Sequence, residues 1–265
     1  MASLLFSSNV SLARRLEHAE AANAFALARS AKVVAESICG GCAIYGGAGS
    51  PFTHLLGGGM EGPVSAAEFD RLEEFYRKLG SPCLIDACPL ADISFLDHIF
   101  RRGYKVIELN NLLARTISPC ERFPSPPQGV EVKLVHGEDV KTWSRVVAQG
   151  FANEENPPSE MLNVMSSMTD ASQNYLVTVD GTPAGGGAMG MQSGVGMFYG
   201  DATRTIERGR GVQTAVINAR LQAAQQAGCD LAMVTVVPGT ASHRNYERAG
   251  FELVYMRVNV IRELN

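Results

Sequence analysis

The chain has 265 residues, of which 46% are hydrophobic, and its formal net charge at pH 7 is −4. The hydrophobic fraction is sufficient for a packed core and excludes a disordered protein, and the mild acidity argues against a nucleic-acid partner. No run of about eighteen apolar residues is present, so we expect no membrane partner either.

The N-terminal half begins without a signal-like segment. Residues 1–20 carry no charged region ahead of a long apolar stretch, so we expect a cytoplasmic protein with mostly reduced cysteines.

Cys39 and Cys42 form a C-x-x-C pair in an apolar run, a spacing that occurs in redox sites and, when doubled, in zinc sites. Because only one such pair is present and no histidine lies at ligand spacing, we favour core cysteines and expect no metal.

The stretch ERFPSPPQG at residues 121–129 has the composition of a linker, because its three prolines cannot continue a helix or a central strand. On each side of it the order helix, strand, proline, helix, Gly-aromatic, strand occurs with similar spacing. GSPCLIDACP and RRGYKVIEL in the first half correspond to GCDLAMVTVVP and ERAGFELVY in the second. We therefore predict an α/β (α+β) chain of two domains, residues 1–124 and 130–265, with a linker at 125–129.

The second half has a readable order of elements on either side of a glycine-rich loop. Before the loop we expect a strand at 131–134, a helix at 139–149, further helical turns at 161–168, and strands at 175–179, 184–191 and 195–203. The Asp180-Gly181 turn signal predicts that these strands form an antiparallel meander. After the loop we expect a helix at 212–226, a buried strand at 231–237, a helix at 241–249 and a final strand at 251–261.

The loop itself, IERGRGVQTAV at residues 206–216, alternates Arg208 and Arg210 with Gly209 and Gly211 directly before a helix. The first N–H groups of a helix lack intrahelical partners, and the helix dipole is positive there. Glycines allow close backbone approach, and arginines add charge, so the loop suits a phosphate or pyrophosphate. The alternative is a tight turn with solvated arginines. The spacing excludes both a Walker loop and a dinucleotide-binding fingerprint.

This loop, its helix and the segment Tyr246-Glu247-Arg248-Ala249-Gly250-Phe251 resemble the GNAT superfamily of acyl-CoA-dependent N-acetyltransferases. The loop is similar to the family's Gln/Arg-x-x-Gly-x-Gly/Ala pattern, although Ile206 departs from its first position, and the segment is similar to a closing Tyr-x-x-x-Gly-Phe. The resemblance covers the second half, and the first half looks like a degenerate copy, as in tandem-GNAT proteins. It implies two tandem GNAT-like domains, each a mixed, mostly antiparallel sheet flanked by helices with splayed central strands.

The resemblance also implies where acetyl-CoA binds as a cosubstrate. Loop N–H groups would hold its pyrophosphate, the pantetheine arm would enter between the splayed strands, and the acyl carbonyl would meet an N–H group at a strand bulge. The residues expected to bind coenzyme A are Thr203, Arg208, Gly209, Arg210, Gly211, Val212, Gln213 and Thr214.

Acyl transfer to an amine requires a group that removes a proton from the amine, and it benefits from a proton donor for the leaving thiolate. Tyr246 matches the family's usual donor; the alternative is an aromatic side chain packed behind Phe251. Asp201 is the best single candidate for the base; the alternative, which is the commoner one for such residues, is a solvated surface carboxylate. In the first half Ile99 stands where Tyr246 stands in the second, so we expect the first half to be catalytically empty.

The leading interpretation is an N-acetyltransferase that transfers an acetyl group from acetyl-CoA to a primary amine of a small molecule or peptide, by direct attack in a ternary complex. The alternative is a non-catalytic acyl-CoA-binding sensor or assembly module, because no clear base is present and the first half is empty. A weaker alternative is a redox protein that uses Cys39 and Cys42. The sequence does not name the acceptor, and a homodimer is compatible with it.

Overall fold

The chain forms two compact units, each assembled from more than one stretch of sequence. The computed structural model describes residues 10–30, 33–47, 50–169 and 172–264. Unit 1 comprises the described residues up to Leu113, Val236–Pro238 and those from Leu253 onward, and unit 2 comprises Ala114–Thr235 and Gly239–Glu252. Within the described part of the chain, no helix is both long enough and apolar enough to cross a membrane.

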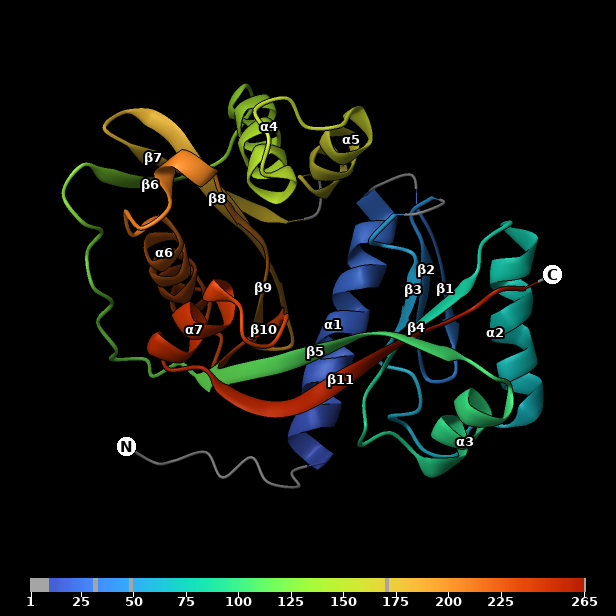
Figure 1. Cartoon of the computed structure of the whole chain (residues 1–265). Helices are drawn as coiled ribbons and strands as arrows, with labels where there is room; N and C mark the ends of the chain where they lie inside the picture. The colour runs from blue at the N-terminus through green and yellow to red at the C-terminus, as the bar shows by residue number, and fades with distance from the viewer. Residues whose placement is uncertain (1–9, 31–32, 48–49, 170–171, 265) are drawn as a thin grey trace. The chain divides into compact units, whose positions relative to one another are not determined.

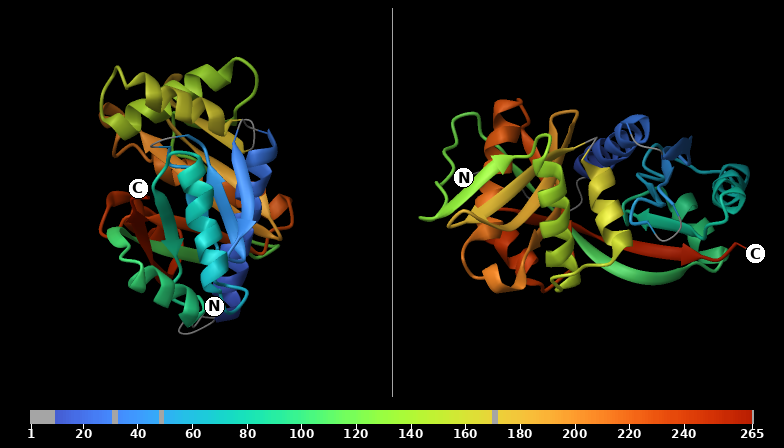
Figure 2. Two further views of the ribbon diagram at one scale, coloured as in Figure 1. Left: turned by 90° about the vertical axis from the view of Figure 1, so that its right-hand side faces the viewer. Right: turned by 90° about the horizontal axis from the view of Figure 1, so that it is seen from above.

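Unit 1 is a mixed sheet with helices on both sides. Its elements are α1 (Val10–Ser30), β1 (Val34–Ile38), β2 (Gly41–Tyr45), β3 (His54–Leu56), α2 (Ala66–Lys78), β4 (Cys83–Ala87), α3 (Ile93–Arg101), β5 (Lys105–Thr116) and β11 (Glu252–Arg262). The strand order is β1-β2-β3-β4-β11-β5. Strands β3 and β4 run parallel, whereas the pairs β1–β2, β2–β3 and β4–β11 are antiparallel. Helices α1 and α2 lie on opposite sides of β1, β2 and β3 (Figures 1 and 2).

The C-terminal strand β11 completes the sheet of unit 1. It pairs with β4 in a register that joins Val258 to Ala87 and Arg262 to Cys83. The buried Arg257 also links β11 to α1, because its Nη2 donates a 2.7 Å hydrogen bond to Glu17 Oε1. The domain boundaries inferred from the sequence stay predictions.

Unit 2 contains the elements expected on both sides of the glycine-rich loop. They are β6 (Val130–Leu134), α4 (Asp139–Ala152), α5 (Ser159–Met168), β7 (Gln173–Val179), β8 (Thr182–Gln192), β9 (Val195–Thr203), the 3₁₀ turn η1 (Thr205–Glu207), α6 (Val212–Gln226), β10 (Leu231–Val236) and α7 (Ala241–Arg248). The strand order is β10-β9-β8-β7-β6. Strands β6 to β9 pair antiparallel, and β10 is parallel to β9.

Three successive glycines in β8 allow helices to pack closely on both faces of this sheet. A Cβ atom at Gly186 would lie 2.8 Å from Nε1 of Trp143 on α4, and one at Gly187 would lie 2.9 Å from Nη1 of Arg220 on α6. Neighbouring residues of a strand point to opposite faces, so α4 and α6 cover opposite faces of the sheet (Figure 1).

The same succession of elements occurs in both units. Three antiparallel strands (β1–β3 or β7–β9) are followed by a helix (α2 or α6) and then by a strand parallel to the third one (β4 or β10). Both sheets are mixed and mostly antiparallel, and helices flank them. The predicted fold class is therefore confirmed.

Candidate active site

The central strands of unit 2 separate halfway along their length. Strands β9 and β10 pair from Val195 opposite Leu231 to Phe198 opposite Val234, and no further pair between them occurs among the described residues. At the same level β9 carries a bulge against β8. Ala188 pairs with Tyr199 and Gly186 with Ala202, so Gly187 faces two residues of β9. A bulge bends its strand and re-aims the local backbone groups, which explains why the predicted splay occurs at this point.

The loop after β9 presents a row of backbone donors at the start of α6. Gly211 is the N-cap residue of α6 with a left-handed φ of 82°, and no side chain caps this end. Within the described residues, the N–H groups of residues 209–214 donate no hydrogen bond. Unpaired amides and the positive end of the helix dipole together favour an anion. The predicted anion-binding residues therefore have suitable geometry.

Both arginines of the loop pair with groups of unit 2. Arg210 contacts Asp180 at 2.5 Å and Glu207 at 3.0 Å. Arg208 donates to Oδ1 of Asn153 at the C-terminal end of α4. Both side chains are exposed, so a bound anion can compete for them in water, where such ion pairs are weak.

The four remaining predicted cofactor residues lie around this loop, each in a different environment. Thr203 ends β9 opposite Gly185, and Thr214 is exposed in the first turn of α6. Val212 is buried against β8. The side chain of Gln213 faces α7, since it donates to Ser242 Oγ at 2.8 Å and accepts from Asn245 at 2.7 Å. Only the backbone of Gln213 is thus directed to the anion site.

The two predicted catalytic residues lie in direct contact. The hydroxyl of Tyr246, on α7, donates a 2.7 Å hydrogen bond to Asp201 Oδ2 at the bulge of β9. Tyr246 is fully buried, and its ring packs edge-on against Phe251 with centroids 5.0 Å apart. Burial raises the pKa of Tyr246 well above its ordinary value, despite the lowering effect of Arg220, and Asp201 raises it further. The phenol is therefore protonated throughout the neutral range.

Asp201 is not a free carboxylate in this structure. Its Oδ1 lies 2.6 Å from Nη1 of the fully buried Arg220, and its Oδ2 accepts hydrogen bonds from Arg220 at 2.9 Å and Gln213 at 3.2 Å. With the bond from Tyr246, Oδ2 thus accepts three hydrogen bonds, whereas Oδ1 faces the guanidinium without a hydrogen bond among the described residues. The role of Asp201 as the base stays a prediction, and its contacts instead favour the orientation of Tyr246.

Sequence reasoning missed Arg220. The residue stands at position i+4 from Val216 within the apolar stripe of α6, where its burial could have been suspected because a charged residue interrupts a core-facing pattern. The glycine run in β8 was the second available signal, since a side chain at Gly187 would collide with both Arg220 and Asp201.

The corresponding helix start in unit 1 is already satisfied by its own chain. Ser65 caps α2 by accepting from Glu68 N at 3.2 Å, and Val64 N donates to Ser94 Oγ at 2.8 Å. In addition, Cβ atoms at Gly58 and Gly59, just after β3, would each lie 2.7 Å from atoms of Phe95. The side chain of Phe95 thus lies directly beside the glycines that follow β3. That the first half is catalytically empty stays a prediction.

The first cysteine of the C-x-x-C pair, Cys39, lies in the hairpin turn between β1 and β2, and the second, Cys42, lies in β2. Cys39 and Cys42 are buried free thiols, and burial raises the pKa of each to about 12. Thiolates are therefore scarce at neutral pH, which disfavours redox chemistry at this pair. Among the described residues, no group of three His, Cys, Asp or Glu side chains could hold a metal ion.

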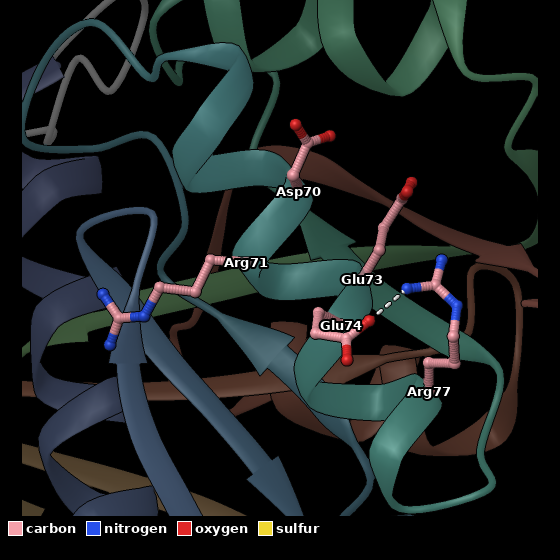
Figure 3. Close-up of a pocket in the computed structure, with 5 residues that line it drawn as sticks. All are labelled: Asp70, Arg71, Glu73, Glu74 and Arg77. Atoms are coloured by element: carbon pink, nitrogen blue, oxygen red, sulfur yellow. Dashed lines mark hydrogen bonds and ion pairs between the residues drawn. The ribbon is translucent and has the colours of Figure 1, made fainter.

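A surface hollow of about 530 Å³ lies on α2 of unit 1 and is lined by Asp70, Arg71, Glu73, Glu74 and Arg77 (Figure 3). Its charges are paired. Arg77 contacts Glu74 at 2.5 Å, and Arg262 and Arg102 contact Glu73. The hollow shares no residue with the loop and splay of unit 2.

Comparison with known proteins agrees with this geometry. Residues 141–251 match the model of the acetyltransferase (GNAT) family, a range that includes the splayed strands, the glycine-rich loop and Tyr246. No curated protein has a sequence that matches this chain.

Several solved structures share the fold at low sequence identity. A GCN5-related N-acetyltransferase from Kribbella flavida superposes with a TM-score of 0.69 at 18% identity, over 95% of this chain and 96% of that one. A GCN5-related N-acetyltransferase from Sphaerobacter thermophilus gives a TM-score of 0.58 at 19% identity, over 74% and 67%. A tandem GNAT protein from the clavulanic acid biosynthesis pathway gives 0.56 at 14% identity, over 74% and 69%. The resemblance inferred from the sequence is thereby confirmed.

Proposed function

Because the chain carries a GNAT acetyltransferase domain over residues 141–251, we propose that it transfers an acetyl group from acetyl-CoA to a primary amine. The observation that carries the proposal is the uncapped start of α6, where the N–H groups of residues 209–214 donate no hydrogen bond within the described part of the chain. These donors and the nearby Arg208 and Arg210 suit a pyrophosphate. Its binding at the mouth of the splay would aim the thioester between β9 and β10.

The reaction needs charge stabilisation and two proton movements. Attack of a neutral amine on the thioester carbonyl develops negative charge on the carbonyl oxygen, and an N–H group at the β9 bulge would stabilise it. The carbon–sulfur bond then breaks, and the thiolate takes a proton. We assign that proton to Tyr246, which is protonated at neutral pH and stands beside the bulge. The amine nitrogen loses its proton to water, and the phenolate regains one from water, so protons balance.

Asp201 has a supporting role in this proposal. A thiolate of ordinary pKa, about 8.5, takes a proton poorly from a phenol of raised pKa unless the phenolate is stabilised. Arg220 Nη2 lies 3.0 Å from the Tyr246 oxygen, close enough to provide that stabilisation. Asp201 holds both partners in place. In this proposal the amine proton passes to water, and Asp201 as the base is the alternative route.

Acetyl-CoA-dependent thiol release with a panel of amines tests the activity. We expect turnover with at least one small-molecule or peptide amine, and a Tyr246→Phe variant should lose roughly 10²- to 10⁴-fold in kcat, the usual contribution of general acid–base catalysis. Tyr255→Phe is the matched control, because Tyr255 is also buried and also donates to a carboxylate, on Glu17 in unit 1. Full activity of Tyr246→Phe would remove Tyr246 as the donor.

A non-catalytic acyl-CoA-binding module is the second candidate function, and the occupied state of Asp201 favours it. It predicts coenzyme A binding by calorimetry without thiol release for any amine. Turnover of any amine well above the rate in buffer contradicts it. The cytoplasmic location and a homodimer stay predictions.

A further inference from the structure

The middle of α6 carries a fully buried arginine whose side chain joins four elements of unit 2. The Arg220 guanidinium donates to Ala188 O on β8 at 2.9 Å and to Tyr199 O on β9 at 3.4 Å. It also donates to Asp201 Oδ2 at 2.9 Å and to the Tyr246 hydroxyl at 3.0 Å, while Nε bonds to Val216 O within α6. Its donors thus reach both sides of the β9 bulge and the oxygen of Tyr246.

The surroundings of Arg220 are shaped for a guanidinium. A Cβ atom at Gly187 would lie 2.7 Å from Asp201 Oδ1 and 2.9 Å from Arg220 Nη1, so only glycine leaves room for the pair. The guanidinium carbon lies 4.5 Å from the centre of the Phe198 ring, within the range of a cation–π contact. The planar group is therefore held on its face and along its edges.

We propose that Arg220 is a positioning residue of the transfer site: its guanidinium holds the β9 bulge and the Tyr246 oxygen in one rigid assembly. This inference rests on the proposed function, because it concerns the residue assigned there as the proton donor.

Stability alone is a poor reason for this arrangement. Replacing a buried ion pair by apolar residues of similar volume is often neutral or stabilising, because removing two charges from water is costly. Arg220 also makes more contacts than charge compensation requires, since the Asp201 carboxylate alone would neutralise it. A lysine would supply the same charge from a single point, whereas only arginine offers a planar set of five donors.

The position of Arg220 suits the proton step. In the resting site the Tyr246 hydroxyl donates to Asp201 and accepts from Arg220. When the proton passes to the leaving thiolate, the phenolate oxygen keeps the Arg220 N–H as a charge-assisted donor. The guanidinium thereby limits the cost of forming the phenolate and fixes the place from which the proton departs.

Unit 1 contains a comparable buried arrangement of its own. Arg257 is also fully buried, donates to Glu17 Oε1 at 2.7 Å, and shares that carboxylate with the hydroxyl of Tyr255. It likewise combines a buried arginine, a carboxylate and a tyrosine, with a glutamate in place of the aspartate, and it joins β11 to α1. A substitution of Arg257 therefore disturbs a comparable buried ion pair while every residue of the proposed site stays unchanged.

Arg220→Lys and Arg257→Lys form the test, with kcat and KM for acetyl-CoA measured per folded molecule, as determined by circular dichroism and thermal unfolding. We expect both variants to unfold at lower temperature. Arg220→Lys should lose roughly a hundredfold in kcat, within the range of acid–base contributions, with little change in KM, whereas Arg257→Lys should keep its kcat. If Arg220→Lys keeps the wild-type kcat, or if both variants lose kcat equally, the inference is overturned.

A second variant covers the case in which Arg220→Lys does not fold. Arg220→Met/Asp201→Asn removes both charges and leaves no uncompensated ion. Folded protein with a strongly reduced kcat supports the inference, and folded protein with normal kcat overturns it. Wild-type turnover is measured first: its absence removes the proposed function together with this inference, whereas turnover unaffected by either Arg220 variant removes this inference alone.

Discussion

Replacing Gly211 with alanine tests the anion-binding loop at its most constrained residue. Gly211 is the N-cap residue of α6 with φ at 82°, and a Cβ atom there would lie 2.9 Å from Pro127 Cγ. A left-handed conformation costs a non-glycine residue about 1–2 kcal/mol. In the Gly211→Ala variant, the ligand-free loop can relax to another conformation. Residue 211 must then return to the left-handed conformation before the loop can bind the ligand.

Binding then has to supply this conformational cost. A penalty of about 1–2 kcal/mol corresponds to a roughly 5- to 30-fold increase in the Kd for coenzyme A, and the contact with Pro127 adds to it. The assay is isothermal titration calorimetry with coenzyme A, together with thermal unfolding of each variant.

Gly228→Ala is the matched control, because Gly228 follows the other end of α6 with φ at 80° and nothing within 4 Å of its Cβ position. It should lower thermal stability by a similar amount and leave the Kd unchanged. If Gly211→Ala binds coenzyme A with wild-type affinity while both variants lose similar stability, the loop amides do not hold the ligand and the reasoning is refuted.

Three further predictions concern charges and packing. Asp180→Asn releases Arg210 from its 2.5 Å ion pair, so the Kd for coenzyme A should fall up to about fivefold, as calorimetry at low salt would show. Gly187→Ala pushes apart the ion pair beneath the β9 bulge and should destabilise the protein by about 1–3 kcal/mol in urea unfolding; an unchanged midpoint contradicts this. Burial lowers the pKa of His54, but the Asp86 carboxylate 3.2 Å away outweighs burial and raises that pKa above its ordinary value. The folded state therefore binds this proton more tightly, and the stabilisation is complete below about pH 6.5 and lost as pH rises through the folded pKa. His54→Gln should accordingly reduce the difference in Tm between pH 5.5 and pH 8.5.

Local sequence patterns were sufficient to predict the secondary-structure elements of the second half and the loop. Turn residues such as Asp180-Gly181 and the apolar spacing of residues 212–226 depend on neighbours a few positions away, so they are readable without a structure. The Gly209 and Gly211 pattern likewise marks a helix start that no side chain caps, and the structure has this geometry.

Contacts between residues distant in the sequence could not be predicted in this way, because they depend on how the elements pack. The final strand was predicted from its own residues, but its pairing with β4 joins Val258 to Ala87, positions that no local pattern connects. Asp201 looks like a free carboxylate in the sequence, and only the packing of α6 over the β9 bulge brings Arg220 within 2.6 Å of it. Burial and partner choice are properties of the assembled core, and they determine whether a carboxylate is a base or an ion-pair partner.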